Sequence, residues 1–178
     1  MRVFLYIASI LLANVLTAKF APIEIGPLFF PVGSLLIGAT FILRDFVQQQ
    51  VGRKKTYMYI GTALILSAAV SLLLGDTMMI AAASALAFIV SETFDTELFT
   101  RLRTSFYKRV AISGVVGGTF DSFIFVLVGL SPIGAGFLPW ELVPYAIAGQ
   151  LIAKICMQFI GVACLVQLTK WRKRPLVA

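Results

Sequence analysis

The sequence predicts an all-α integral membrane protein whose single domain, residues 1–178, crosses the bilayer six times. Composition is the first reason: 60% of the 178 residues are hydrophobic and 13% are charged, whereas soluble domains are about a quarter charged. The second is a mean hydropathy of +0.96, because so apolar a chain cannot cover its surface in water. The third is the recurrence of apolar runs of the length that a spanning helix needs, roughly 20 residues.

Breakers and charges divide the chain into six spans joined by short loops. The first begins after Arg2 and lacks a clean small-residue cleavage site, so we expect it to be retained rather than removed as a signal peptide. Pro22 and Pro27 separate it from the second span, which ends at Gly52. The last span is long enough that it must tilt or project from the bilayer. The six expected spans are residues 3–20, 28–51, 56–74, 77–95, 110–130 and 142–169.

Basic residues are concentrated on one side of these spans. Loops rich in Lys and Arg stay in the cytoplasm, whereas the opposite loops carry Glu24, Asp76 and Glu141. We therefore expect both termini in the cytoplasm and interpret the net charge of +7 as a topology signal, with no nucleic-acid partner. The cytoplasmic group contains twelve of the 15 basic residues: Arg2, Arg53, Lys54, Lys55, Arg101, Arg103, Lys108, Arg109, Lys170, Arg172, Lys173 and Arg174.

Asp121 and Lys154 lie well inside the fifth and sixth spans, where ionised side chains are rare and often mark a site. From the helical rise, Asp121 is roughly 14 Å and Lys154 roughly 18 Å from the outer side, so we expect them to pair near the midplane and bind a ligand. Gln150 shares the face of Lys154, and Asn14 has a comparable depth in the first span. The alternative is an ion pair that only joins two helices.

A second layer of charges lies near the cytoplasmic ends of the second and fourth spans. Arg44 and Asp45 precede the basic cluster that begins at residue 53, while Glu92 and Asp95 share a helix face at i, i+3. We expect this layer to gate or couple ligand release. Snorkelling and helix pairing also explain charges at a membrane boundary, so a purely structural role stays open.

The fifth span also contains small residues at helical spacing. Gly114 and Gly118 form a small-xxx-small pattern, which lets a neighbouring backbone approach closely. We therefore expect this span to pack tightly against another helix.

The chain has no histidine and two cysteines, Cys156 and Cys164. Eight residues apart on one expected helix, the cysteines are separated by roughly 12 Å, which is too far for a disulfide. Without histidine, a histidine-ligated metal site and a serine–histidine hydrolase are excluded, and we expect no cofactor, metal or catalytic residue. Two other classes stay open, namely an intramembrane enzyme that uses Glu92 with Asp95, or Asp45 near Asp95, as paired carboxylates, and a membrane scaffold.

Several short motifs, spread in order over nearly the whole chain, carry a resemblance to a known family. They are residues 13–19, Arg44-Asp45 followed by Gly52, residues 95–103, residues 117–122 with Phe125, and Lys154. In these motifs the chain resembles the queuosine-precursor transporter family, also called the vitamin uptake transporter (VUT) or YhhQ-type family. The interval 46–51 departs from the family, because many members have an acidic or polar residue and an aromatic there.

The resemblance implies a six-helix fold similar to that of energy-coupling-factor substrate-binding subunits. It also implies import through the inner membrane of a queuosine precursor for tRNA modification, either 7-cyano-7-deazaguanine (preQ0) or a related deazapurine such as queuine. An alternative is a substrate-binding subunit that needs a separate ATPase module, since the chain has no GxxxxGK[ST] loop of its own. The expected partners are the deazapurine and the lipid bilayer, and association into a homo-oligomer stays open.

The polar residues of the spans suit such a ligand. A deazaguanine presents an N–H and an amine side by side, which the Asp121 carboxylate can accept together. Its carbonyl needs a donor, which Lys154, Asn14 or Gln150 can supply. Aromatic side chains can stack on the flat ring, and the candidates are Phe120, Phe30 and Trp140.

Overall fold

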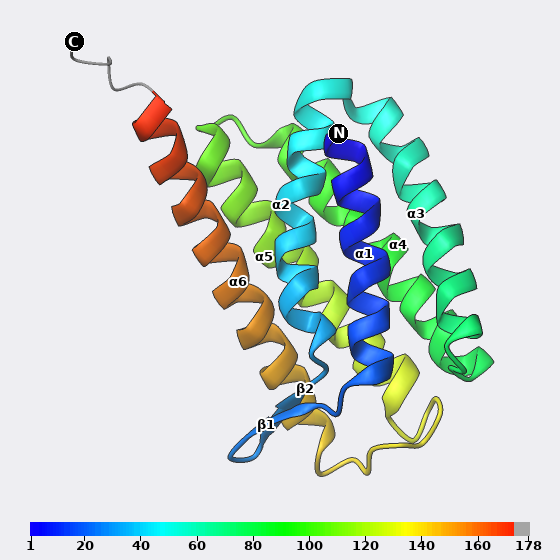
Figure 1. Ribbon diagram of the computed structural model, residues 1–178. Coiled ribbons are helices and arrows are strands. Elements are labelled where there is room, and N and C mark those ends of the chain that lie inside the picture. The colour runs from blue at the N-terminus through cyan, green and yellow to red at the C-terminus, as the bar shows by residue number, and fades with distance from the viewer. Residues whose placement is uncertain (173–178) are drawn as a thin grey trace.

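The computed structural model describes residues 1–172, with side chains up to residue 167, and its architecture is helical as the composition predicts. Six long helices of the described chain form a bundle (Figure 1). Their bounds are α1 Arg2–Lys19, α2 Gly33–Val51, α3 Arg53–Leu73, α4 Met78–Arg101, α5 Phe106–Ile124 and α6 Val143–Arg172.

Five of the helices in the described chain are long and apolar enough to cross a membrane. The helix outside this group is α2, which has 19 residues. Arg44, Asp45 and three successive glutamines interrupt the apolar run of α2. Its charged side chains are buried inside the bundle, where they can be paired rather than exposed to lipid.

The connection between α1 and α2 differs from the loop expected from the sequence. β1 (Ile23–Ile25) and β2 (Leu28–Phe30) pair as antiparallel strands, and α2 begins at Gly33 instead of residue 28. Pro31 explains the delay, because a proline holds the preceding residue in an extended conformation and lacks an amide proton. Gly26 forms the hairpin turn with a φ of 60°, which side-chain-bearing residues rarely adopt.

The fifth expected span also differs in its winding. Beyond α5 the chain continues as a π-helix, η1 (Phe125–Leu130). The span still ends at residue 130, as the sequence predicts. π-Helical turns inside α-helices are frequent at functional sites, and Phe125 lies one turn beyond Asp121. The sequence contains no signal for this change of winding.

Gly114 and Gly118 lie on the face of α5 that packs against α6. A side-chain carbon added at Gly114 would collide with Gln158, and one added at Gly118 would touch Lys154. Because Gln158 and Lys154 are themselves four residues apart on α6, the two helices are aligned along this seam. The expected close packing is confirmed, and it brings Asp121 of α5 within reach of α6.

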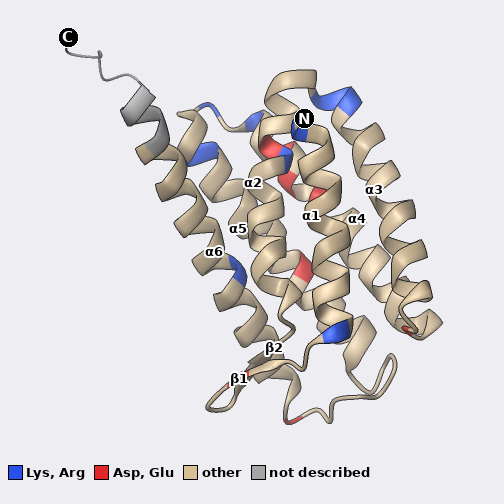
Figure 2. Ribbon diagram, viewed as in Figure 1, with Lys and Arg blue, Asp and Glu red and all other residues tan. Residues whose placement is uncertain are grey.

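The two ends of the bundle differ in charge. Figure 1 places the N-terminus and the α2–α3 and α4–α5 connections at one end, which we call the N-terminal end, and the β1–β2 hairpin at the other, the hairpin end. Most Lys and Arg of the described chain gather at the N-terminal end (Figure 2). The side chains of Lys170, Arg172, Lys173 and Arg174, which belong to the expected cytoplasmic group, lie outside the described residues.

Candidate functional site

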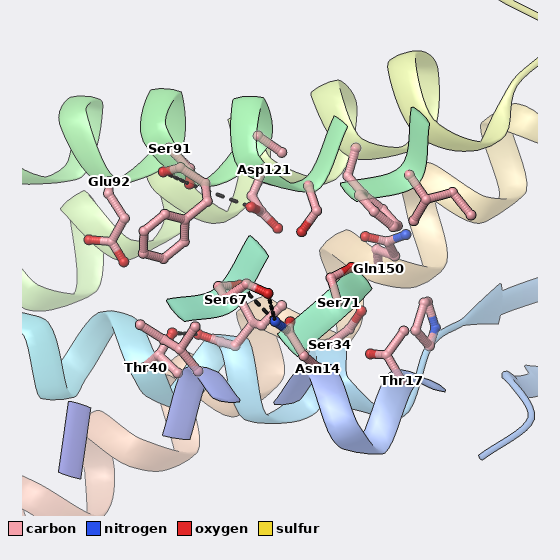
Figure 3. A pocket seen from close by; sticks show the side chains of 18 of the residues that line it. Asn14, Thr17, Ser34, Thr40, Ser67, Ser71, Ser91, Glu92, Asp121 and Gln150 are labelled. Atoms are coloured by element: carbon pink, nitrogen blue, oxygen red, sulfur yellow. Dashed lines mark hydrogen bonds between the residues drawn. The ribbon is translucent and has the colours of Figure 1, made fainter. Parts of the chain in front are cut away.

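A cavity lies inside the bundle between α1, α2, α3, α4 and α5, and it reaches Gln150 of α6. The volume of this cavity that water can enter is about 90 Å³, which is room for several waters. Figure 3 shows its labelled polar side chains around a common space, with Glu92 at one end, Thr17 at the other and Asp121 between them. The cavity is therefore an internal polar site in a largely apolar bundle.

The ammonium group of Lys154 is hydrogen-bonded in three directions. Nζ lies 2.6 Å from Asp121 Oδ2, 2.9 Å from Ser122 Oγ and 3.1 Å from Gln150 Oε1, and the side chain is 2% exposed. Since an ammonium has three protons, each of them has an acceptor in the protein. The expected pairing of Asp121 with Lys154 is confirmed. The cavity wall itself is formed by Asp121 and Gln150, with Lys154 behind them.

Asp121 and Gln150 each retain a polar atom for the cavity. Because Lys154 can only donate, the Gln150 amide turns its oxygen toward Nζ and its nitrogen away. Gln150 Nε2 is buried and has no hydrogen-bond partner among the described residues. On the carboxylate, Ser91 Oγ donates to Asp121 Oδ1 over a long 3.5 Å. One cavity wall thus contains a donor without a partner, Gln150 Nε2, and an acceptor with only a long hydrogen bond, Asp121 Oδ1.

Asn14 lies on the opposite wall, where Figure 3 shows it with Ser67 across the cavity from Asp121. Its Nδ2 donates to Ser67 Oγ at 2.7 Å and to the Ser67 carbonyl at 3.2 Å. These bonds join α1 to α3 and use the amide nitrogen. The Asn14 oxygen is therefore the atom that this residue can offer to a ligand.

Arg44 is completely buried among three carboxylates, and we call these four residues the Arg44 cluster. Its Nη2 lies 3.1 Å from Asp45 Oδ1 and also pairs with Asp95 Oδ2, while Nε lies 3.3 Å from Glu92 Oε2. All three acids are at most 1% exposed. Of the four residues, Glu92 also lines the cavity. The two polar layers expected from the sequence therefore meet at Glu92.

Amide and hydroxyl groups fix Arg44 to α4. Its Nη1 donates to Gln48 Oε1 and to Thr96 Oγ1, both at 2.9 Å. Gln48 Nε2 in turn donates to Thr100 Oγ1 at 2.8 Å. These bonds join α2 to α4 next to the cavity, on the side of the N-terminal end. The sequence analysis missed Gln48, although its i, i+4 spacing from Arg44 is a signal for such a contact.

A second hollow continues the cavity toward the hairpin end. It extends to Phe137 in the α5–α6 loop, which is 60% exposed. The cavity is thus approached from the hairpin end, whereas the Arg44 cluster lies at its other end. The residues that line both spaces are Thr17, Pro31, Asp76, Ile80, Phe125 and Gln150.

The aromatic residues expected to stack on a ligand lie away from the cavity lining. Phe120 stacks on Phe94 with ring centroids 4.1 Å apart, because a residue next to Asp121 points about 100° away from it around the helix. Phe30 is buried in β2, and Trp140 is 52% exposed in the loop before α6. The stacking role expected for these three residues is not supported by their positions.

Three other phenylalanines line the cavity, Phe41, Phe88 and Phe125. Helical spacing from a buried charge is a signal for all three, since Phe41 precedes Arg44 by three residues and Phe125 follows Asp121 by four. Phe88 precedes Glu92 by four residues and carries the same signal. For these three residues, spacing from a buried charge is a better guide than adjacency in the sequence, although Phe99, four residues after Asp95, does not line the cavity.

Comparison with known proteins places the chain among transporters. The sequence profile of one family matches residues 64–168, more than half of the chain. The matched region contains Glu92, Asp95, Asp121, Gln150 and Lys154. No curated protein and no solved structure matches the chain significantly. The chain therefore belongs, as a multi-pass membrane protein, to the family described as "Putative vitamin uptake transporter".

Proposed function

We propose that this protein imports a deazapurine precursor of queuosine, 7-cyano-7-deazaguanine or a relative such as queuine, across the inner membrane. Family membership supports the import of a small organic molecule. The basic N-terminal end in Figure 2 supports an arrangement of six spans with both termini in the cytoplasm. In this orientation the hollow at the hairpin end faces the outside, from which a nutrient arrives.

The observation that carries the proposal is the weakly used acceptor of Asp121 on the same wall as the free donor of Gln150. The ring N–H and the exocyclic amine of a deazaguanine lie side by side, so one carboxylate can accept both. The neighbouring carbonyl of the ring would accept a hydrogen bond from Gln150 Nε2. Lys154 then acts as a positioning residue that orients both groups from behind.

The cavity also offers aromatic surface for a flat ring. Phe41, Phe88 and Phe125 are contributed by three different elements, α2, α4 and η1. Stacking of a nucleobase on an aromatic side chain is worth about 1–3 kcal/mol by alanine substitution. Polar recognition of one edge and stacking on the faces together fit a small heterocycle better than a linear or aliphatic ligand.

Equilibrium binding to the purified protein in nanodiscs tests this assignment. We compare 7-cyano-7-deazaguanine with 7-cyano-7-deazaadenine, which lacks the pyrimidine N–H, the adjacent 2-amine and the carbonyl. The guanine-type ring should bind roughly 100-fold more tightly, since three hydrogen bonds of about 1 kcal/mol each are lost with the other ring. Equal affinity for the two rings, or no binding of the first, would contradict the proposal.

Transport by the chain alone separates the importer from the subunit that needs an ATPase module. Proteoliposomes that contain only this chain should take up labelled 7-cyano-7-deazaguanine. Uptake that occurs only in a host with an ATPase module would identify the chain as a substrate-binding subunit. The same assay with queuine as competitor shows which precursor is preferred.

A further inference from the structure

The Arg44 cluster contains more negative than positive groups. One guanidinium faces three carboxylates, and all four side chains are at most 1% exposed. Charges interact strongly where water is excluded, and carboxylates that share a site resist ionising together. With every acid ionised, the cluster would have two uncompensated negative charges.

Among the described side chains, the neighbouring helices do not supply the missing positive charge. From α1 the cluster meets the Tyr6 hydroxyl, and from α5 it meets the Ser113 hydroxyl, both of which are neutral. Arg109 of α5 also acts on Asp45, but its Nε donates to the Phe99 carbonyl at 2.9 Å and it is only half-buried. Even when Arg109 is counted in full, one negative charge stays uncompensated.

The other buried or paired cations of residues 1–167 are already matched. Lys154 of α6 is paired with Asp121, the one acidic residue of α5. From α3, Arg53 lies 2.8 Å from Glu97. In addition, Asp45 Oδ2 is buried and has no hydrogen-bond partner among the described residues. The cluster therefore has both an excess of negative charge and an unsatisfied carboxylate oxygen.

We propose that the Arg44 cluster binds a proton that is co-transported with the ligand, and that Glu92 exchanges this proton with the cavity. Glu92 is the member of the cluster that also lines the cavity (Figure 3), so a proton can reach it through water there. The inference deepens the proposed import function and rests on it. A proton fits better than a metal ion, because the Arg44 guanidinium already occupies the space among the three carboxylates.

The exchange is a simple proton transfer with a structural consequence. A proton from the outer water adds to the Glu92 carboxylate, which weakens its ion pair with Arg44 Nε at 3.3 Å. Arg44 keeps Asp45 and Asp95, but one link between α2 and α4 is weakened. When the cluster opens toward the cytoplasm, Glu92 releases the proton and pairs with Arg44 again. One positive charge enters per cycle, so a proton gradient drives accumulation.

Uptake by proteoliposomes under an imposed pH gradient tests this coupling. We compare labelled 7-cyano-7-deazaguanine uptake with the outside acidic and with equal pH on both sides. For a one-to-one symport, one pH unit raises the accumulation at equilibrium about tenfold, and a protonophore abolishes the increase. In Glu92→Gln the ratio of the two uptakes should fall to one, because the side chain no longer exchanges a proton.

Glu97→Gln is the matched control, since Glu97 lies on the same helix but bonds Arg53 and Tyr57 at the N-terminal end. This variant should keep the wild-type ratio. Uptake that ignores the pH gradient, or that follows a sodium gradient instead, overturns proton coupling and leaves import intact.

Infrared spectra of the protein in nanodiscs provide a readout that needs no transported ligand, and they decide the question if no uptake is found. Acidification should increase the band of a protonated carboxyl in the wild type and in Glu97→Gln, and by a smaller amount in Glu92→Gln. Identical spectra for the wild type and Glu92→Gln would overturn the proposal. Absence of uptake together with the expected spectra would count against the import function only.

Discussion

Lys154 Nζ lies 2.6 Å from Asp121 Oδ2, and this contact joins α6 to α5 inside the bundle. The same ammonium also fixes the amide of Gln150. One buried cation therefore determines which atoms of two cavity-lining residues are left for a ligand. Its effect on binding is indirect, because all three of its protons have acceptors in the protein.

Removal of either partner of this pair should destabilise the protein. Asp121→Ala leaves a buried ammonium without its counter-ion, and Lys154→Ala leaves a buried carboxylate, so each should lower the free energy of unfolding by about 3–5 kcal/mol. The double variant should lose less than the sum of the two single variants, as expected for a coupled pair. Thermal unfolding in detergent measures these differences.

Ligand binding by the double variant separates a binding role from a purely structural one. We expect the folded double variant not to bind 7-cyano-7-deazaguanine measurably, because the acceptor of Asp121 is gone. A folded double variant that binds with near wild-type affinity would show that the pair only joins two helices.

The free amide nitrogen of Gln150 should control affinity for the ligand, although Gln150→Glu should also lower stability because it buries a second carboxylate near Asp121. Gln150→Glu keeps the size of the side chain and the bond from Lys154, but it replaces the donor that faces the cavity with an acceptor. Affinity for 7-cyano-7-deazaguanine should fall roughly 10-fold to 100-fold, since each tenfold change corresponds to about 1.4 kcal/mol. Gln50→Glu, at an exposed position of α2, should leave affinity unchanged; an equal loss in both variants would point to a general charge effect.

Reporter fusions should show that alternate connections lie on opposite sides of the membrane. Fusions after Lys55, Arg103 and Arg174 should report the cytoplasm, because the basic loops are retained there. Fusions near Asp76 and Pro139 should report the outside. An inverted result at any of these positions would be incompatible with six spans and two cytoplasmic termini.

The charge pairs could be predicted from the sequence because a charged side chain inside a membrane-spanning helix needs an oppositely charged partner. Asp121 and Lys154 had to meet, since either one alone is unfavourable inside a membrane helix. Depth along a helix follows from residue number, and face follows from i, i+3 and i, i+4 spacing. These rules also placed Arg44, Glu92 and Asp95 at a common level, where the structure brings them into contact.

Details that depend on contacts between helices could not be predicted in the same way. The amide nitrogen of Gln150 is free because Lys154 donates to the amide oxygen. Helical periodicity does not specify from which side Lys154 approaches this amide. Phe120 was chosen for its adjacency to Asp121, but adjacent residues point to different sides of a helix. The β1–β2 hairpin is too short to give a clear periodic signal, although Gly26 and Pro27 indicate the turn.

Neutralising Asp45 should reduce transport and leave binding nearly unchanged. Asp45 is fully buried and lies 3.1 Å from Arg44 Nη2, whereas the cavity wall at this end is formed by Glu92. Asp45→Asn therefore leaves Arg44 to its two partners on α4, Glu92 and Asp95, which tightens the α2–α4 closure without altering groups that face the ligand. A shift of about 1.4 kcal/mol in this closure would change the balance of open and closed states roughly tenfold, and we expect a comparable fall in uptake rate.

Affinity, measured in detergent where the ligand reaches both ends, should stay within about twofold because the binding wall is unchanged. If affinity falls together with uptake, the Arg44 cluster is part of the binding site rather than a gate.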